Sequence, residues 1–170
     1  MSVPRNRAGP IVALCVITSA GCSGGLPDRA VVSAAPAPGG VPCASAIRIG
    51  ELPAWARDGF APGISVRHVV GARGDIVAIL FGYPYAAPPR PGRTSKILWA
   101  ARPDARTAAS PADAALRIEA TLPGRSGAVV REVADGPGPS SVDLPAPGCW
   151  HLSLAWSGHT DELDIPYEAG

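Results

Sequence analysis

Imidazole and carboxylate side chains gather near the end of the chain, where their types could hold a metal ion. His151, His159, Asp161, Glu162 and Asp164 lie close together in the sequence. Imidazole nitrogens and carboxylate oxygens are common ligands of divalent transition metals. Neither an HxH nor an HExxH spacing occurs. We therefore expect a solvated hairpin face; the alternative is a small envelope metal-binding protein or enzyme that uses the His151/Asp164 face.

Other residues belong to types that hydrolases use, but the pattern around them favours no reaction. These residues are His68, Asp75, Asp143 and Ser153. No strand-to-helix nucleophile elbow is predicted, and nothing in the sequence places a base beside a nucleophile. A phosphate-binding GxxxxGK loop does not occur. We expect a non-catalytic protein that uses no cofactor and no nucleotide.

The segment YPYAAPPRPGR (Tyr83–Arg93) is the strongest candidate for a binding surface. Its four prolines favour extended or polyproline conformation. Tyr83 and Tyr85 offer amphipathic contact area, and the guanidinium groups of Arg90 and Arg93 can bind carboxylates in a fork. The alternative is a stiff connector whose tyrosines pack against the rim of the core.

The start of the chain has the layout of an export signal. An apolar run, Ile11–Ala20, follows two arginines and ends in small residues directly before Cys22. Small residues before a cysteine are typical of a lipoprotein cleavage site. The run is half the ~20 apolar residues that a membrane-spanning helix needs. We expect residues 1–21 to be a signal peptide and Cys22 to carry lipid on the extracytoplasmic face of the cell membrane.

Two further cysteines would remain after such processing. Cys43 and Cys149 would then be the free thiols of an exported chain, and exported proteins fold in oxidising surroundings. We expect the two to form a disulfide. The alternative is two unpaired thiols.

Charge limits the choice of partners. The chain has 15 basic and 14 acidic residues, and residues 1–21 hold two of the basic ones, so the mature net charge is −1. A near-neutral chain with no basic run gives no footprint for nucleic acid. The expected partners are the membrane, through the lipid, and an envelope protein.

After Cys22 the chain divides into a linker and one domain. Residues 22–42 are rich in Gly, Ala, Ser and Pro and contain no aromatic residue, which predicts a disordered linker. From residue 43 to residue 170 the periodicity favours strands. The expected strands are Ile47–Leu52, Ile64–Val70, Asp75–Phe81, Lys96–Ala101, Leu116–Leu122, Ala128–Ala134, Ser141–Leu144 and a final hairpin.

In that hairpin we place the turn on Gly158 and His159, with Ser157 opposite Thr160. This register sorts nearly all apolar residues of the two strands to one face. Between the second and third strands, Arg73-Gly74-Asp75 matches a three-residue adhesion motif, but we interpret it as a tight turn. Seven to nine short strands separated by Pro and Gly predict an all-β fold, an antiparallel immunoglobulin-like β-sandwich.

Three segments of the domain resemble a family of uncharacterised actinobacterial lipoproteins with an immunoglobulin-like domain. They are RHVVGARGDIVAILFGYP (67–84), SKILWAA (95–101) and PSSVDLPAPGCWHLSLAWSGHTDELDIPY (139–167). The resemblance covers most of the domain and implies the same compartment and fold. It implies no catalytic residue. The sequence thus predicts a lipid-anchored binding or structural module of the bacterial cell envelope.

Overall fold

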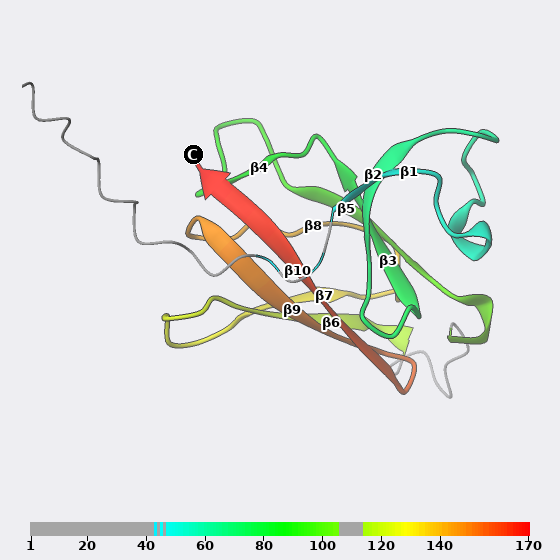
Figure 1. The fold of residues 1–170 in the computed structure, drawn as a ribbon. Coiled ribbons are helices and arrows are strands. Elements are labelled where there is room, and N and C mark those ends of the chain that lie inside the picture. The colour runs from blue at the N-terminus through cyan, green and yellow to red at the C-terminus, as the bar shows by residue number, and fades with distance from the viewer. Residues whose placement is uncertain (1–42, 44, 46, 106–113) are drawn as a thin grey trace, which may run out of the picture. The chain divides into compact units, whose positions relative to one another are not determined.

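The computed structural model describes residues 43, 45, 47–105 and 114–170, and within them nearly all the regular secondary structure is β-strand (Figure 1). The predicted signal peptide 1–21, the linker 22–42 and Cys22 lie outside the described residues. The strands are β1 (Arg48–Gly50), β2 (Val66–Val70), β3 (Ile76–Phe81), β4 (Tyr85–Ala87), β5 (Lys96–Ala101), β6 (Leu116–Thr121), β7 (Val129–Val133), β8 (Pro139–Ser141), β9 (Gly148–Trp156) and β10 (His159–Ala169). Two short 3-10 helices, η1 (Ala54–Ala56) and η2 (Pro103–Ala105), complete the described elements.

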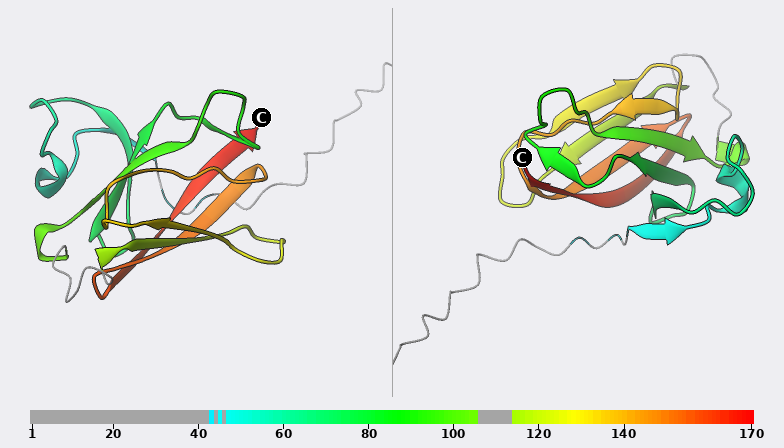
Figure 2. Two further views of the ribbon diagram at one scale, coloured as in Figure 1. Left: turned by 180° about the vertical axis from the view of Figure 1, so that it is seen from behind. Right: turned by 90° about the horizontal axis from the view of Figure 1, so that it is seen from above.

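The strands form two sheets that pack as a β-sandwich (Figure 2). The first sheet has the order β1-β2-β3-β5-β8 and the second has the order β4-β10-β9-β6-β7. The predicted sandwich is therefore confirmed. Two details differ from the prediction: the described residues contain ten strands, and β4 pairs with β10 in parallel. The additional strand is β4, which lies inside the proline-rich segment Tyr83–Arg93, where we expected no strand.

Hydrophobic periodicity explains where most strands lie. In β6, Leu116, Ile118 and Ala120 are buried while the residues between them are exposed or half-buried. β5 has the predicted bounds, and β3 begins one residue later than expected. The strand expected at Ser141–Leu144 lies slightly earlier, at β8, where Pro and two Ser pair with β5 in place of the more apolar residues.

The main core lies between the two sheets and a smaller one lies outside the first sheet. Alternate residues of β3, such as Ile76 and Ala78, face the main core with residues of both sheets. Val77 and Ile79 instead contact Leu52, Ala56 and the half-buried side chains of the β1–β2 connection. Because β3 is covered on both sides, its sequence is a continuous apolar run and does not alternate.

The long β9–β10 hairpin, in orange and red in Figure 1, has a different turn from the one predicted. His159 pairs with Trp156, so the two turn residues are Ser157 and Gly158. Both have positive φ, 47° and 78°, as a type I′ turn requires. The predicted pairing is wrong by two residues along one strand. The predicted inner face is correct, because a shift of two residues leaves every side chain on its side of the sheet.

The disulfide between Cys43 and Cys149 is present, as the sequence predicts, with 5.3 Å between the two Cα atoms. It attaches the beginning of the domain to β9. Within the described residues, no helix is long and apolar enough to cross a membrane.

Trp99, Trp150 and Trp156 are buried in the core, and each finds an acceptor for its indole N–H. Trp99 donates to the Ser140 hydroxyl at 2.9 Å. Trp150 and Trp156 donate to backbone carbonyl groups at 2.8 Å and 2.7 Å. A buried indole N–H without an acceptor would be costly, so these contacts let large aromatic side chains fill the core.

Candidate functional site

The four residues predicted to bind a ligand line one cavity. The cavity has a volume of about 220 Å³ and lies at the segment that joins β3 to β5. Tyr83, Tyr85, Arg90 and Arg93 contribute to its wall, together with Pro84, Ala86, Pro89, Thr94, Ser95 and, from the end of β10, Glu168. The structure therefore brings together all four residues that the sequence singled out.

A tight turn holds the two arginines of the cavity. The Arg93 N–H donates to the Arg90 carbonyl at 3.0 Å, and Gly92 has a φ of 73°. Pro at the second position and Gly with positive φ at the third are typical of a type II turn. Such a turn keeps the Cα atoms of its first and last residues within about 7 Å. Arg90 and Arg93 are thus neighbours that the backbone holds at fixed positions.

Neither guanidinium is neutralised by a partner in the described part of the chain. Arg90 and Arg93 are exposed and make no ion pair with an acidic side chain there. Among the side chains that line the cavity, the single acidic one is Glu168. Two guanidinium groups on the wall of one concave site attract an anion.

Tyrosine rings form one side of the cavity and connect it to the core. The ring of Tyr83 meets that of Tyr85 edge-on, with 5.4 Å between centroids, and Tyr85 meets Tyr167 at the same distance. The Tyr85 hydroxyl donates to the Lys96 carbonyl, and the Tyr167 hydroxyl donates to the Val142 carbonyl. Tyr85 and Tyr167 are therefore anchored, whereas Tyr83 is half-buried.

All three tyrosines of the chain belong to this cluster, and all keep their protons more firmly than free tyrosine. Burial is the main cause that raises the pKa of Tyr83, and the charge of Glu168 raises it further. Burial also raises the pKa of Tyr85 and of Tyr167 well above the usual range. At neutral pH Tyr83 is consequently an uncharged phenol that can donate a hydrogen bond and does not repel an anion.

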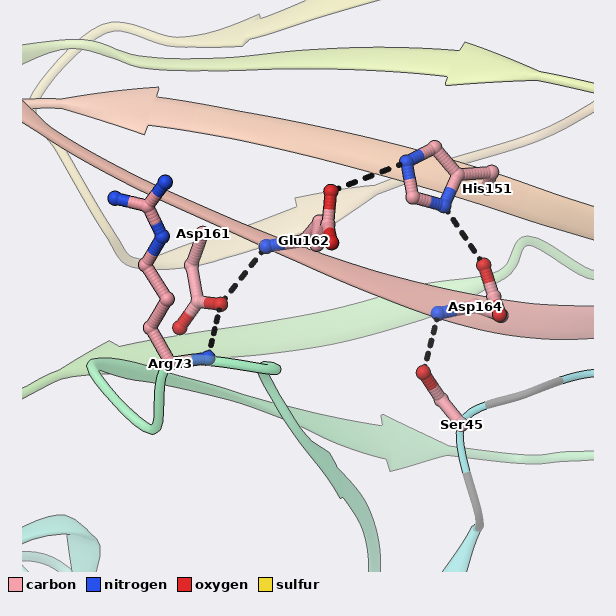
Figure 3. Close-up of polar contacts among 6 residues, drawn as sticks. All are labelled: Ser45, Arg73, His151, Asp161, Glu162 and Asp164. Atoms are coloured by element: carbon pink, nitrogen blue, oxygen red, sulfur yellow. Dashed lines mark hydrogen bonds and ion pairs between the residues drawn. The ribbon is translucent and has the colours of Figure 1, made fainter.

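The His151 face also exists (Figure 3). Its residues alternate along β9 and β10 with the buried ones, so they lie on the outer side of the second sheet. His151 on β9 lies directly opposite Asp164 on β10, with 2.9 Å between Nδ1 and Oδ1. Its Nε2 lies 3.6 Å from an oxygen of Glu162. Across residues 43, 45, 47–105 and 114–170, no group of three or more His, Cys, Asp or Glu side chains is arranged to hold a metal ion.

The hydrolase-type residues lie on different elements of the described part of the chain, with His68 on β2, Asp75 just before β3, Asp143 after β8 and Ser153 on β9. His68 is buried in β2 of the first sheet, where its Nδ1 lies 3.1 Å from the Val66 carbonyl. Ser153 is exposed on β9 of the other sheet. Asp143 accepts the backbone N–H of Ser95 at 2.8 Å. These contacts are those of residues that hold strands and turns together.

Asp161 was considered in the sequence only as a possible metal ligand, and its structural role was missed. It is 4% exposed, and it accepts the backbone N–H groups of Arg73 and Glu162, each at 2.8 Å (Figure 3). It also accepts the backbone N–H of Asp75 at 3.1 Å. The Arg73-Gly74-Asp75 segment is thus a turn that β10 holds in place. The one available signal was a charged residue at an inward position of an otherwise apolar strand face.

Comparison of the chain with protein-family models, curated protein sequences and solved structures found no match.

Proposed function

We propose that this chain is a lipid-anchored, non-catalytic binding module on the extracytoplasmic face of a bacterial cell membrane. In this proposal Cys22 carries the lipid, residues 22–42 form the linker, and an immunoglobulin-like domain presents the cavity to an envelope partner. The export signal in the sequence supports the location. The Cys43–Cys149 disulfide supports it too, because such bonds persist in oxidising compartments.

The observation that carries the binding role is the uncompensated arginine pair at the cavity. A turn holds the backbone of Arg90 close to that of Arg93, both residues line the cavity, and no acidic side chain of the described residues pairs with either. Like charges held together reduce stability, so a packing role alone gives no reason for the arrangement. A partner that supplies an anion gives a reason for this arrangement.

Capture of envelope components tests the binding role. The tagged full chain is expressed in its own host, cross-linked and purified from membranes, beside an Arg90→Ala/Arg93→Ala variant. Deletion of 83–93 is unsuitable because it would remove β4 and the buried Tyr85. We expect the variant to lose its main cross-linked partner. Equal capture by both proteins would refute the role of the cavity.

A matched control is available on another turn. Leu122-Pro123-Gly124-Arg125 repeats the Pro-Gly turn, with the Arg125 N–H donating to the Leu122 carbonyl at 3.0 Å and a Gly124 φ of 79°. Arg125 is exposed and does not line the cavity. An Arg48→Ala/Arg125→Ala variant removes the same charge from exposed positions and should capture the partner normally.

Mass spectrometry of the protein from its host tests the anchor. We expect a mature chain that begins at Cys22 and carries fatty acid, and a Cys22→Ser variant that keeps residues 1–21. Recovery of an unacylated chain with an intact start would refute the anchor and leave the cavity result unaffected.

The metal-binding alternative stays a prediction with its own test. Its basis is the position of His151 between Glu162 and Asp164. Titration of the protein with Zn²⁺ at micromolar concentration should then show binding that His151→Ala abolishes. Absence of binding would remove this alternative.

A further inference from the structure

The size of the cavity limits what it can hold. Sites that enclose a whole drug-sized molecule have volumes of roughly 300–1,000 Å³. At about 220 Å³, this cavity has room for one terminal group or one side chain of a larger ligand. The ligand therefore presents an end or a single residue to the cavity.

The neighbouring edge of the sheet argues against a partner that adds a strand. β4 is the outermost strand of its sheet, and no strand of the described residues pairs with its outer edge. It is three residues long, and Pro84 precedes it while Pro88 and Pro89 follow it. Proline has no N–H to donate, and a three-residue edge offers few backbone groups. Recognition must come from the side chains of the cavity.

The charges of the cavity distinguish between anions. Arg90 and Arg93 together match a flat carboxylate, which a guanidinium binds through two parallel hydrogen bonds. Glu168 adds a negative charge to the same wall. After burial, this charge is the second cause that raises the pKa of Tyr83, against the charge of Arg67, which lowers it. A phosphate dianion carries two negative charges and would be repelled by Glu168 more strongly than a singly charged carboxylate. A carboxylate with an N–H group close by can contact the two guanidinium groups through its oxygens and the Glu168 carboxylate through its N–H.

We propose that the cavity binds the C-terminal carboxylate of a peptide, with Arg90 and Arg93 holding the carboxylate and Glu168 accepting an N–H of the terminal residue. This inference rests on the proposed binding function and names its ligand class. The half-buried ring of Tyr83 packs against the terminal residue, and its neutral hydroxyl donates to the carboxylate. The cavity is thus a receptor for chain ends.

The test uses simple probes on the full chain in detergent solution. N-acetyl-trialanine with a free carboxylate is compared with its C-terminal amide and with inorganic phosphate, by calorimetry and by NMR shifts of the Gly92 and Arg93 amides. We expect the acid to bind at least about tenfold more tightly than the amide, a difference of about 1.4 kcal/mol. We expect phosphate to bind more weakly than the acid.

Variants then assign the contacts. Arg90→Gln/Arg93→Gln should weaken the acid peptide at least about tenfold, and Arg48→Gln/Arg125→Gln should leave it unchanged. All four side chains are exposed, so folding should be retained, and circular dichroism checks this. Glu168→Ala should lower the ratio of peptide affinity to acetate affinity several-fold, because acetate has no N–H for Glu168 to accept.

A failure of the carboxylate inference can be distinguished from a failure of the proposed function. Equal affinity for acid and amide, tighter binding of phosphate, or no binding of the acid overturns the carboxylate inference. If capture of the envelope partner still depends on Arg90 and Arg93, the proposed function survives that failure. If capture is also independent of the two arginines, both are wrong.

Discussion

Replacement of Asp161 should destabilise the domain strongly, because its carboxylate holds a turn that has no other anchor of this kind among the described residues. The turn joins β2 to β3, and β10 supplies Asp161 from the other sheet. One further bond runs from the Ala72 N–H to the Glu162 carbonyl at 2.9 Å. Asp161 therefore connects the two sheets at this end of the sandwich.

The hydrogen bonds of Asp161 determine how much stability its replacement should cost. Asp161→Ala leaves three backbone N–H groups, those of Arg73, Asp75 and Glu162, without their acceptor. A buried donor left without an acceptor costs about 1–3 kcal/mol, and water entering the vacated space recovers part of that. We expect the free energy of unfolding to fall by about 3 kcal/mol. Asp58→Ala, at an exposed position, is the control and should change it by less than about 0.5 kcal/mol.

Gly71 provides a second variant that reports on the same contact. A Cβ placed on Gly71 would lie 2.3 Å from Oδ2 of Asp161, and its three nearest atoms all belong to that carboxyl group. Gly71→Ala should therefore cost about 1–3 kcal/mol in the natural chain, as overpacking does. In the Asp161→Ala background the same substitution has space and should cost little.

Guanidinium unfolding of the four proteins of this cycle measures the coupling. We expect the two substitutions to be non-additive by about 1 kcal/mol or more, since they share one contact. Additive costs would show that the carboxyl group does not fill the space above Gly71. A stable Asp161→Ala variant would show that the three N–H groups do not depend on it.

Two further predictions concern the tyrosines and the disulfide. Because the pKa values of Tyr83, Tyr85 and Tyr167 are raised in the folded state, the unfolded chain releases phenolic protons first as pH rises through about 10. We expect the tyrosines to leave the free energy of unfolding unchanged below pH 10 and to lower it above pH 10. Absorbance at 295 nm should show little tyrosinate at pH 10 until the protein unfolds. Half-ionised tyrosine in the folded protein would contradict the burial. Replacement of both Cys43 and Cys149 by Ser should cost about 4–5 kcal/mol by loop-closure entropy, measured by urea unfolding, and an intact mass equal to the dithiol form would contradict the bond itself.

Much of the fold could be predicted because local patterns and core packing agree. The apolar run of β3 and the alternation of β6 identify strands that bury two faces and one face, respectively. The type I′ turn was missed because glycine fits more than one turn type. Ser157 at a φ of 47° is an unusual choice that the fold enforces by pairing Trp156 with His159.

The candidate cavity could be predicted in its residues but not in its shape. Tyr83 to Arg93 are contiguous, so composition alone indicated an amphipathic, cationic segment. Glu168 could not be foreseen as a neighbour, because it reaches the cavity through the parallel pairing of β4 with β10. Parallel pairing joins segments far apart in the chain and leaves no short-range signal.

Asp161 shows why a sequence pattern can mark a residue without explaining it. Its position alternates with Leu163, Ile165 and Tyr167 toward the core, so a carboxylate there breaks the pattern. A buried charge is tolerated when hydrogen bonds compensate it, and here the compensation comes from a turn about 90 residues earlier in the chain. The charged residue at position 161 and the glycine at position 71 therefore belong to one contact. The Asp161 carboxyl group occupies the space that a side chain at position 71 would need.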